Sequence, residues 1–364
     1  MKKIKVLHVC DSLDKGGLEE VIYNLVKNTN DQEFEASVAC FKGGVVAERL
    51  KEKGFTCYEI NEQKKIPRIN KLKNYMKEGQ FDIVQVHFSF HGILAAKLAG
   101  VKVIETTHNT YHFFENPWGR LKYSFYLNLV DSIVSVSKTV ENFNLANFKI
   151  MNKKKTVVIR NSIDSERVSP TERTKEELKR EFGLPENSFV ISTLSRIDVQ
   201  KGLEYFIEAA KMLNQKYDQL VFLIPGEGSQ DYSQSLRNIA EGVDNIRFIG
   251  HVSKVNELFK VIDIFAMTSL WEGAPLTLLE AMAYGKAVVV TDVGNTAEVI
   301  QDNVNGFLVE KKDVQAFVDR VMTLIDHPEK RLAIEGQAQQ DFNEKFSNQI
   351  MISTYKQLYK SLIN

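Results

Sequence analysis

Two glutamates eight residues apart, Glu272 and Glu280, are the strongest candidates for chemistry in this sequence. They lie in the run EGAPLTLLEAMAYGKAVVV, where a Gly-Ala-Pro turn follows the first glutamate and apolar residues then recur at helical spacing. We therefore expect Glu272 in a loop and Glu280 on the helix that this loop enters. The apolar neighbours of Glu280 would make an unpaired carboxylate costly, which predicts a polar partner for it.

The start of this helix is suited to binding anions or hydroxyl groups. Pro275 is compatible with the first helical position, because its missing N–H would have no partner there in any case. The amides of the first turn then face a ligand at the positive end of the helix dipole. Glu272 can accept hydrogen bonds from sugar hydroxyls, and Glu280 can accept two from a ribose diol. The backbone amides available for such contacts are those of Gly273, Ala274, Leu276 and Thr277.

Two cations stand close together in the stretch STLSRIDVQKGLEYF. Arg196 follows a predicted strand, and Lys201 directly precedes a predicted helix. A planar guanidinium and a compact ammonium at a helix start suit a diphosphate. The alternative is a pair of solvent-exposed surface charges without a ligand.

Glycine-containing turns follow several of the predicted strands. Gly16 and Gly17 stand between the first strand and its helix, where they would let a ligand approach the backbone closely. A tight turn without a ligand explains them equally well, and the third glycine of the dinucleotide fingerprint is missing. Gly226 and the pair Gly250-His251 end two later strands. Because parallel strands end at one edge of a sheet, these turns are expected on a common rim.

The elements that must position these residues alternate between strands and helices, which predicts parallel sheets covered by helices on both faces. A chain of 364 residues is longer than a single core usually serves. We therefore predict an α/β protein with two Rossmann-like domains facing a central cleft. The expected division is residues 1–164, a polar linker at 165–175, a second domain at 176–340, and a C-terminal helix at 341–364 that crosses back to the first domain.

Composition narrows the classes of protein. Lys plus Arg and Asp plus Glu balance at 47 each, whereas a nucleic-acid-binding protein usually carries a positive excess. The chain has no apolar run long enough to span a membrane, and its first residues have too short a run for a signal peptide. The cysteines fall in predicted strands without metal-ligand spacing. We therefore expect a cytoplasmic protein that binds no nucleic acid.

Together these residues resemble the retaining glycosyltransferases of family 4, the glycogen-synthase-like enzymes also called glycosyl transferases group 1, which have the GT-B fold. The Glu-x7-Glu spacing is the most specific part of this resemblance, which covers nearly the whole chain and is strongest in its second half. The residues that carry it are Gly16, Gly17, His108, Arg196, Lys201, Gly202, residues 225–228, Glu272 and Glu280.

The resemblance implies that the first domain binds an acceptor and the second binds a nucleotide-sugar donor, with UDP as the default nucleotide. It also implies a hexosyltransferase that retains the configuration of the sugar, in bacterial polysaccharide, glycolipid or glycoconjugate synthesis. At matching positions, Arg196 and Lys201 would stabilise the leaving diphosphate, Glu280 would hold the ribose, Glu272 and His108 would face the transferred sugar, and Gly17 would contact the diphosphate or the acceptor.

No cofactor or metal is expected, because the chain lacks the Asp-x-Asp triplet that binds metal in the other glycosyltransferase fold. Two other functions remain open. A nucleotide-sugar 2-epimerase of the same fold would isomerise a donor without an acceptor, and a non-catalytic protein would only bind the nucleotide sugar. Incubation with a nucleotide sugar distinguishes the three functions. Release of the nucleotide indicates a transferase, an isomerised donor indicates an epimerase, and binding without reaction indicates the non-catalytic protein.

A basic stretch in the first domain bears on the acceptor. Residues 61–80 combine many lysines with a helical apolar face, and the aromatic-rich segment 111–129 follows His108. A solvated basic helix is one explanation. The other is peripheral attachment to an anionic membrane, which would bring a lipid-linked acceptor to the protein; sugar or protein-linked acceptors also stay open.

Overall fold

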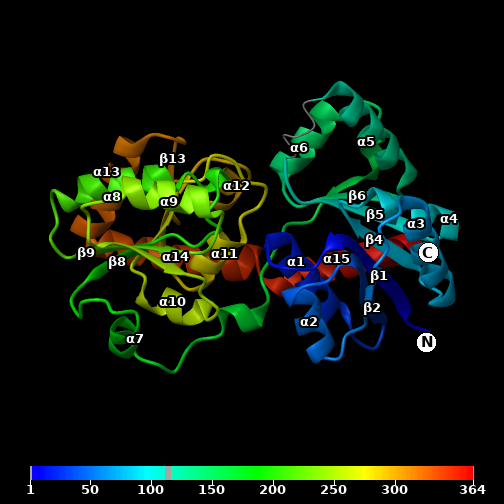
Figure 1. Ribbon diagram of the computed structural model, residues 1–364, viewed down its shortest axis with the longest axis horizontal. Coiled ribbons are helices and arrows are strands. Elements are labelled where there is room, and N and C mark those ends of the chain that lie inside the picture. The colour runs from blue at the N-terminus through cyan, green and yellow to red at the C-terminus, as the bar shows by residue number, and fades with distance from the viewer. Residues whose placement is uncertain (1, 111–115, 364) are drawn as a thin grey trace. The chain divides into compact units, whose positions relative to one another are not determined.

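The computed structural model describes residues 2–110 and 116–363, and its chain divides into two compact units. The first unit comprises residues 1–162 together with 348–364, and the second comprises residues 163–347. Each unit contains one sheet with helices on both sides (Figure 1).

The first unit has a seven-stranded sheet in the order β3-β2-β1-β4-β5-β6-β7, and all of its paired strands are parallel. The central strand β4 is buried along its whole length, as expected for a sheet covered on both faces. The strands are β1 (Ile4–Ser12), β2 (Phe34–Lys42), β3 (Cys57–Glu59), β4 (Ile83–His87), β5 (Lys102–Thr107), β6 (Ser132–Ser135) and β7 (Thr156–Val158).

Alternate residues of these strands pack against different helices of the first unit. Val9 of β1 belongs to the core beneath the third, fourth and fifth helices, whereas its neighbour Cys10 packs with the first two. The helices are α1 (Gly17–Thr29), α2 (Val45–Glu52), α3 (Lys65–Glu78), α4 (Phe90–Ala99), α5 (Pro117–Leu129), α6 (Lys138–Asn147) and the final helix α15 (Asn348–Ile363).

The second unit repeats this design with a six-stranded parallel sheet in the order β10-β9-β8-β11-β12-β13. Both sheets are doubly wound, which confirms the predicted fold class. The strands are β8 (Phe189–Ser192), β9 (Leu220–Pro225), β10 (Ile246–Gly250), β11 (Ile264–Met267), β12 (Ala287–Thr291) and β13 (Phe307–Val309).

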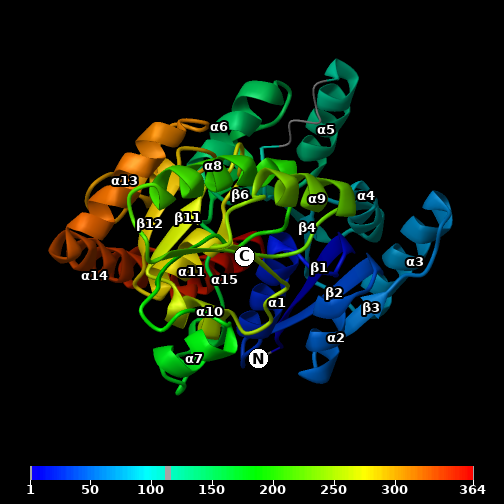
Figure 2. The same cartoon turned by 60° about the vertical axis from the view of Figure 1, so that its left-hand side comes forward.

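Helices of the second unit also form two layers, one containing α8, α9 and α13 and the other containing α7, α10, α11 and α14 (Figure 2). They are α7 (Lys175–Glu181), α8 (Leu203–Asn214), α9 (Gln230–Ile239), α10 (Val255–Val261), α11 (Leu276–Ala283), α12 (Thr296–Val299), α13 (Val314–Asp326) and α14 (Pro328–Lys345). The short 3-10 helices are η1 (Lys153–Lys155), η2 (Ser165–Val168) and η3 (Val199–Lys201).

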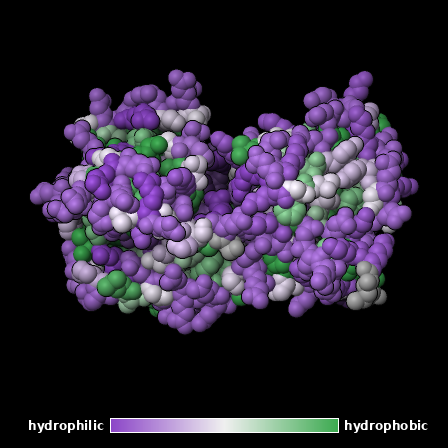
Figure 3. Space-filling view, turned by 90° about the horizontal axis from the view of Figure 1, so that it is seen from below, coloured by the Kyte–Doolittle hydropathy of each residue, from purple (hydrophilic) through white to green (hydrophobic). Residues whose placement is uncertain are grey.

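The surface is mainly hydrophilic. Figure 3 shows one face on which hydrophobic side chains appear only in small separate groups. Within the described part of the chain, no helix has both the length and the apolar character needed to cross a bilayer.

The final helix, α15, is tied to the sheet of the first unit through a buried polar contact. Tyr359 is fully buried, and its hydroxyl donates to the Oε1 atom of Gln85 on β4. The amide of Gln85 donates in turn to Thr106 Oγ1 on β5, 2.9 Å away. At the rim of the same helix, Lys356 pairs with Asp31 at 2.7 Å. Tyr359, Gln85 and Thr106, which are far apart in sequence, therefore form one buried network.

This network predicts the stability of two variants of α15. Tyr359→Phe keeps the shape of the ring but leaves Gln85 Oε1 without its buried donor, which costs about 1–3 kcal/mol of unfolding free energy. Ser361→Ala, which removes only an exposed hydroxyl of the same helix, serves as the matched control. Urea denaturation measures both variants, and equal midpoints would show that the buried contact contributes nothing.

Candidate active site

Two glycines of the second unit let the loops after β8 and β9 touch. Gly226 has a φ of +129°, and a Cβ atom there would lie 1.8 Å from the carbonyl oxygen of Ser195. A Cβ atom on Gly228 would lie 1.8 Å from the carbonyl oxygen of Ile197. Any side chain at either position would push the two loops apart. The glycines therefore support the loop that carries Arg196.

A third glycine holds Lys201 against the end of β11. Lys201 ends the 3-10 helix η3, and Gly202 follows with a φ of +56°. A Cβ atom on Gly202 would come within 2.4 Å of the Thr268 carbonyl oxygen. The Thr268 hydroxyl donates to the Gly202 carbonyl oxygen at 2.9 Å. This contact fixes the backbone from which the Lys201 side chain extends.

Glu272 lies in the loop after β11 and is the centre of a cluster of polar contacts. Its Oε1 atom accepts from Lys201 Nζ at 2.6 Å and from Ser269 Oγ at 2.8 Å. Its Oε2 atom accepts from Gln200 Nε2 at 3.2 Å. Glu272 is only 5% exposed, so the carboxylate requires these donors. The structure thus brings Lys201 and Glu272 together as an ion pair.

Glu280 has a cationic partner that the sequence did not indicate. It is fully buried on α11, and its Oε1 atom accepts from Arg167 Nε at 2.6 Å. Arg167 belongs to η2, and the Tyr284 hydroxyl donates to its carbonyl oxygen at 2.6 Å. Burying a carboxylate beside a guanidinium avoids the large penalty of an uncompensated charge. Arg167 falls in the polar segment expected as a linker, where no periodicity or motif marked it.

The start of α11 differs in one detail from the sequence expectation. Pro275 is the N-cap residue, with φ −68° and ψ 114°, and the helix begins at Leu276. The expectation that Pro275 is the first helical residue was therefore wrong by one position. No side chain caps this end, so the amides of Leu276 and Thr277 lie in a first turn that offers them no intrahelical acceptor.

The other predicted residues of the second unit occupy the same strand ends without joining these ion pairs. Arg196 is exposed and forms no salt bridge with the residues that the structure describes. Gly250 ends β10, and its carbonyl oxygen accepts from the Gly226 amide at 2.7 Å. His251 follows it and is exposed, whereas Gly273 is buried and Ala274 is half-buried.

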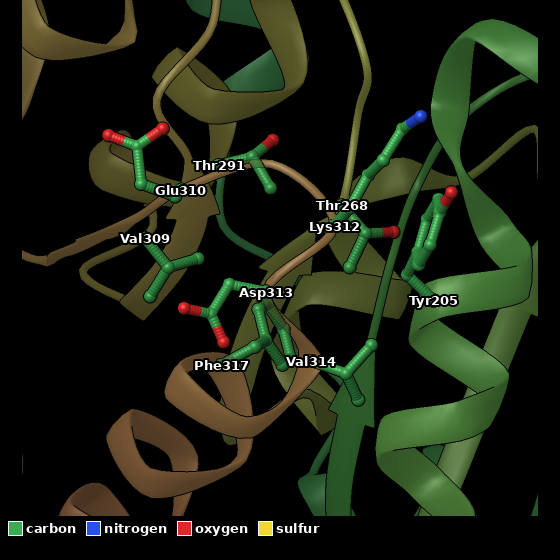
Figure 4. A pocket seen from close by; sticks show the side chains of 9 residues that line it. All are labelled: Tyr205, Thr268, Thr291, Val309, Glu310, Lys312, Asp313, Val314 and Phe317. Atoms are coloured by element: carbon green, nitrogen blue, oxygen red, sulfur yellow. The ribbon is translucent and has the colours of Figure 1, made fainter.

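A small hollow lies beside the Lys201 loop on the side of α8 and α13 (Figure 4). Its space of about 200 Å³ is below the size of typical ligand pockets. The hydroxyls of Thr268 and Thr291 at its wall already donate to backbone carbonyls. The hollow by itself is therefore too small to hold a nucleotide.

Three of the predicted residues belong to the first unit. Gly16 is the N-cap of α1 and Gly17 its first residue, without a side-chain cap. His108 follows β5, and its Nε2 atom lies 2.9 Å from Nδ1 of His87. Burial lowers the pKa of His108 to about 3, so its imidazole is neutral at neutral pH. His87 was not predicted, although a histidine in a run of buried strand residues was a visible signal.

Metal-binding groups do not gather in the described ranges. Among residues 2–110 and 116–363, no group of three or more His, Cys, Asp or Glu side chains could hold a metal ion.

Two family models match this chain, and together they cover most of it. The model of glycosyl transferases group 1 matches residues 174–341, and that of glycosyltransferase family 4 matches residues 15–167. The boundary between them lies near the boundary between the two structural units.

Curated and solved relatives extend along nearly the whole chain. An Escherichia coli UDP-Gal:alpha-D-GlcNAc-diphosphoundecaprenol alpha-1,3-galactosyltransferase is 26% identical, over 89% of this chain and 88% of its own. A Rickettsia africae glycosyltransferase superimposes with a TM-score of 0.89 at 22% identity, over 100% of both chains. Anabaena HepE, solved in complex with UDP and glucose, gives 0.89 at 21% identity, over 98% and 100%. The chain therefore belongs to the glycosyltransferases of group 1 and family 4, and it has the GT-B fold.

Proposed function

We propose that this protein transfers a sugar from UDP to a lipid-linked acceptor with retention of the anomeric configuration. The observation that carries the proposal is the pair of buried glutamates, Glu272 and Glu280, each matched to a cation at the strand ends of the second unit. Stability alone does not explain these buried ion pairs, because apolar side chains of similar volume often give a protein of equal stability.

The proposed donor site uses both pairs. Glu280, oriented by Arg167, accepts from the ribose hydroxyls, and Glu272 accepts from hydroxyls of the transferred sugar. Both acidic side chains are already held in place by hydrogen bonds before the ligand arrives, which lowers the cost of binding. Two relatives support UDP as the nucleotide: the Escherichia coli galactosyltransferase is named for UDP-Gal, and HepE was solved with UDP.

Departure of the diphosphate is the step that needs electrostatic help. Arg196 is exposed and unpaired within the described residues, so its guanidinium is available to phosphate oxygens. Lys201 and the amides of Leu276 and Thr277 add positive charge at the same strand ends. Such preorganised donors stabilise developing negative charge without reorganisation, and we propose that they act without a metal ion. The leaving phosphate then helps to accept the acceptor's proton on the same face.

The acceptor class is inferred from a relative and from the surface of the first unit. The Escherichia coli relative is named for a sugar linked to diphosphoundecaprenol. Helix α5 exposes Trp118, Leu121 and Phe125 at spacings of three and four residues, with Trp118 78% exposed. Lys122 lies among them and is exposed as well. Residues 111–115 of the aromatic segment lie outside the described residues.

Helix α3 adds positive charge to the same unit. Lys64, Lys65, Lys71 and Lys77 are exposed at its start and along its length, and Lys71 pairs with Glu62 at 3.2 Å. Arg68 is engaged elsewhere, because its guanidinium stacks on Phe41 at 4.6 Å. Apolar side chains that enter the interface and lysines that meet anionic headgroups are the two components of peripheral membrane binding. We therefore propose reversible contact with the anionic inner face of the cell membrane.

The first prediction concerns the reaction itself. UDP-hexoses incubated with a sugar diphosphate lipid should give a product whose new linkage has the donor's anomeric configuration, read by proton NMR coupling constants. The rate should persist in excess EDTA, because fixed cations replace the metal. An inverted linkage, or activity that EDTA abolishes and magnesium restores, would contradict the mechanism. An isomerised donor without transfer would instead identify a 2-epimerase.

The second prediction concerns the ribose contact. Glu280→Gln should weaken UDP binding by about 1.5–3 kcal/mol, or roughly ten- to a hundredfold, because charge-assisted hydrogen bonds are lost. Arg167→Met should weaken it as well, since the carboxylate loses its fixed orientation. Glu208→Gln, at an exposed position of α8, is the matched control.

Calorimetry with a UDP analogue that lacks the ribose hydroxyls makes this test specific. The analogue should bind the wild type and Glu280→Gln equally, because the deleted hydroxyls are the ones that Glu280 holds. If Glu280→Gln weakens both ligands by the same factor, the assignment to the ribose is wrong.

The third prediction concerns the membrane. The protein should sediment with vesicles rich in anionic phosphatidylglycerol at low salt and be released at high salt, because each basic residue near the surface contributes about 1 kcal/mol. Replacing Trp118, Leu121 and Phe125 together by serine should reduce binding at both salt concentrations. Leu332→Ser, at a 64% exposed position of α14, should not. Wild-type protein that stays in the supernatant at low salt would point to an acceptor free in solution.

A further inference from the structure

Three histidine rings form a continuous chain inside the first unit. His8 lies on β1, His87 ends β4, and His108 follows β5, so the chain crosses neighbouring strands of the sheet. His8 Nδ1 lies 3.0 Å from His87 Nε2, and His87 Nδ1 lies 2.9 Å from His108 Nε2. Both distances are those of hydrogen bonds between ring nitrogens.

The chemistry of neutral imidazole allows this chain only two arrangements of its protons. Burial lowers the pKa of His8 and of His108 to about 3, and it lowers the pKa of His87 as well. All three rings are therefore neutral at neutral pH, and each has one N–H donor and one bare nitrogen acceptor. If His8 donates to His87, then His87 must donate to His108. If His108 instead donates to His87, then His87 must donate to His8, and all three tautomers are again fixed together.

The two ends of the chain distinguish these arrangements. Neither His8 Nε2 nor His108 Nδ1 has a hydrogen-bond partner in the described parts of the chain. Both of these nitrogen atoms are buried. The His8 side chain as a whole is also fully buried, whereas His108 is partly exposed at the end of its strand, so only an N–H on His108 can come near a substrate. An orphaned N–H deep in the protein is less acceptable than an unused lone pair there. The favoured arrangement leaves the lone pair on His8 and places the free N–H on His108 Nδ1.

We propose that His87 and His8 are positioning residues, which hold His108 in its Nδ1–H form as a hydrogen-bond donor to a substrate oxygen. In this form His108 cannot act as a general base through Nδ1, because that atom already carries its proton. The oxygen would belong to the sugar or diphosphate part of the donor, or to the acceptor. Contact requires the groups that cover Nδ1 to shift, since this atom is itself buried. This inference rests on the proposed function only for the contact between His108 and substrate.

The tautomer can be tested without any activity assay. In the full chain labelled with ¹⁵N-histidine, long-range ¹H–¹⁵N correlation spectra distinguish an Nδ1–H ring from an Nε2–H ring. Signals are assigned by single substitutions at His8, His87 and His108. His108, His87 and His8 should all be Nδ1–H between pH 6 and 8. An Nε2–H ring at His108, or a charged ring within the chain, would overturn the proposal even if the protein proves to be a transferase.

Steady-state kinetics test whether the three hydrogen-bonded histidines affect the rate of the reaction. His87→Phe should lower kcat about tenfold with little change in the donor KM, the size of one lost hydrogen bond. His8→Phe should lower kcat less, and it should have no further effect in the His87→Phe background, because His8 acts only through His87. His91→Phe is the matched control, since His91 lies on α4 with its ring edge-on to Phe41 and outside the chain.

The outcomes separate positioning from a merely structural role. Equal effects of His8→Phe in both backgrounds, or a silent His87→Phe, would contradict positioning. The spectra of each variant show whether it is folded, and the wild-type tautomer decides the proposal if a variant is not. If His108 is an Nδ1–H ring but the protein has no transferase activity, the arrangement of the three histidines is confirmed and the proposed function is rejected instead.

Discussion

A buried carboxylate must have a compensating charge, and this requirement organises the strand ends of the second unit. Glu272 is 5% exposed and Glu280 is fully buried, so an unpaired charge on either side chain would be costly there. Lys201 and Arg167 supply the compensating charge at 2.6 Å each. The loops that carry the two cations must therefore lie where they do. Gly202 serves the Lys201 loop in the same way, since it lets the backbone approach the Thr268 carbonyl oxygen more closely than any side chain permits.

The first unit meets a similar requirement with neutral groups. Its sheet buries histidine, glutamine and threonine side chains at 0–2% exposure, and several of them, such as His8 with His87 and Gln85 with Thr106, hydrogen-bond one another. Tyr359 of the final helix completes one such hydrogen-bond chain, and His108 ends another just after the carboxyl end of β5. Polar groups that are paired in this way gain a fixed orientation, which a solvent-exposed side chain lacks.

The fold class could be predicted from the sequence because both doubly wound sheets are built from strands and helices with local hydrophobic patterns. Buried strands such as AVVVT alternate with amphipathic helices, and each pattern is visible within a dozen residues. The placement of Glu272 in a loop and of Glu280 on a helix followed from the same periodicity, and only the role of Pro275 was off by one position. The contacts of these glutamates with ligand remain predictions.

Long-range pairing could not be predicted in this way. Arg167 and Glu280 are 113 positions apart, and the segment around Arg167 is short, polar and without a periodic pattern. His8 and His87 meet only because β1 and β4 are neighbours in the sheet, although the strands between them in sequence are β2 and β3. Such pairs depend on the order of the strands in the sheet, and this order cannot be read directly from a single sequence. These long-range pairs nevertheless determine which charged and hydrogen-bonding groups meet at the candidate sites.

The proposed function depends on binding of a nucleoside diphosphate at the strand ends of the second unit, beside the two ion pairs. Hydrogen–deuterium exchange of the full chain with and without saturating UDP tests this most directly. We expect slower exchange in peptides spanning residues 195–203 and 272–280, because phosphates and ribose would cover those amides and stabilise their loops. Unchanged exchange in both segments, with protection elsewhere or nowhere, would contradict it.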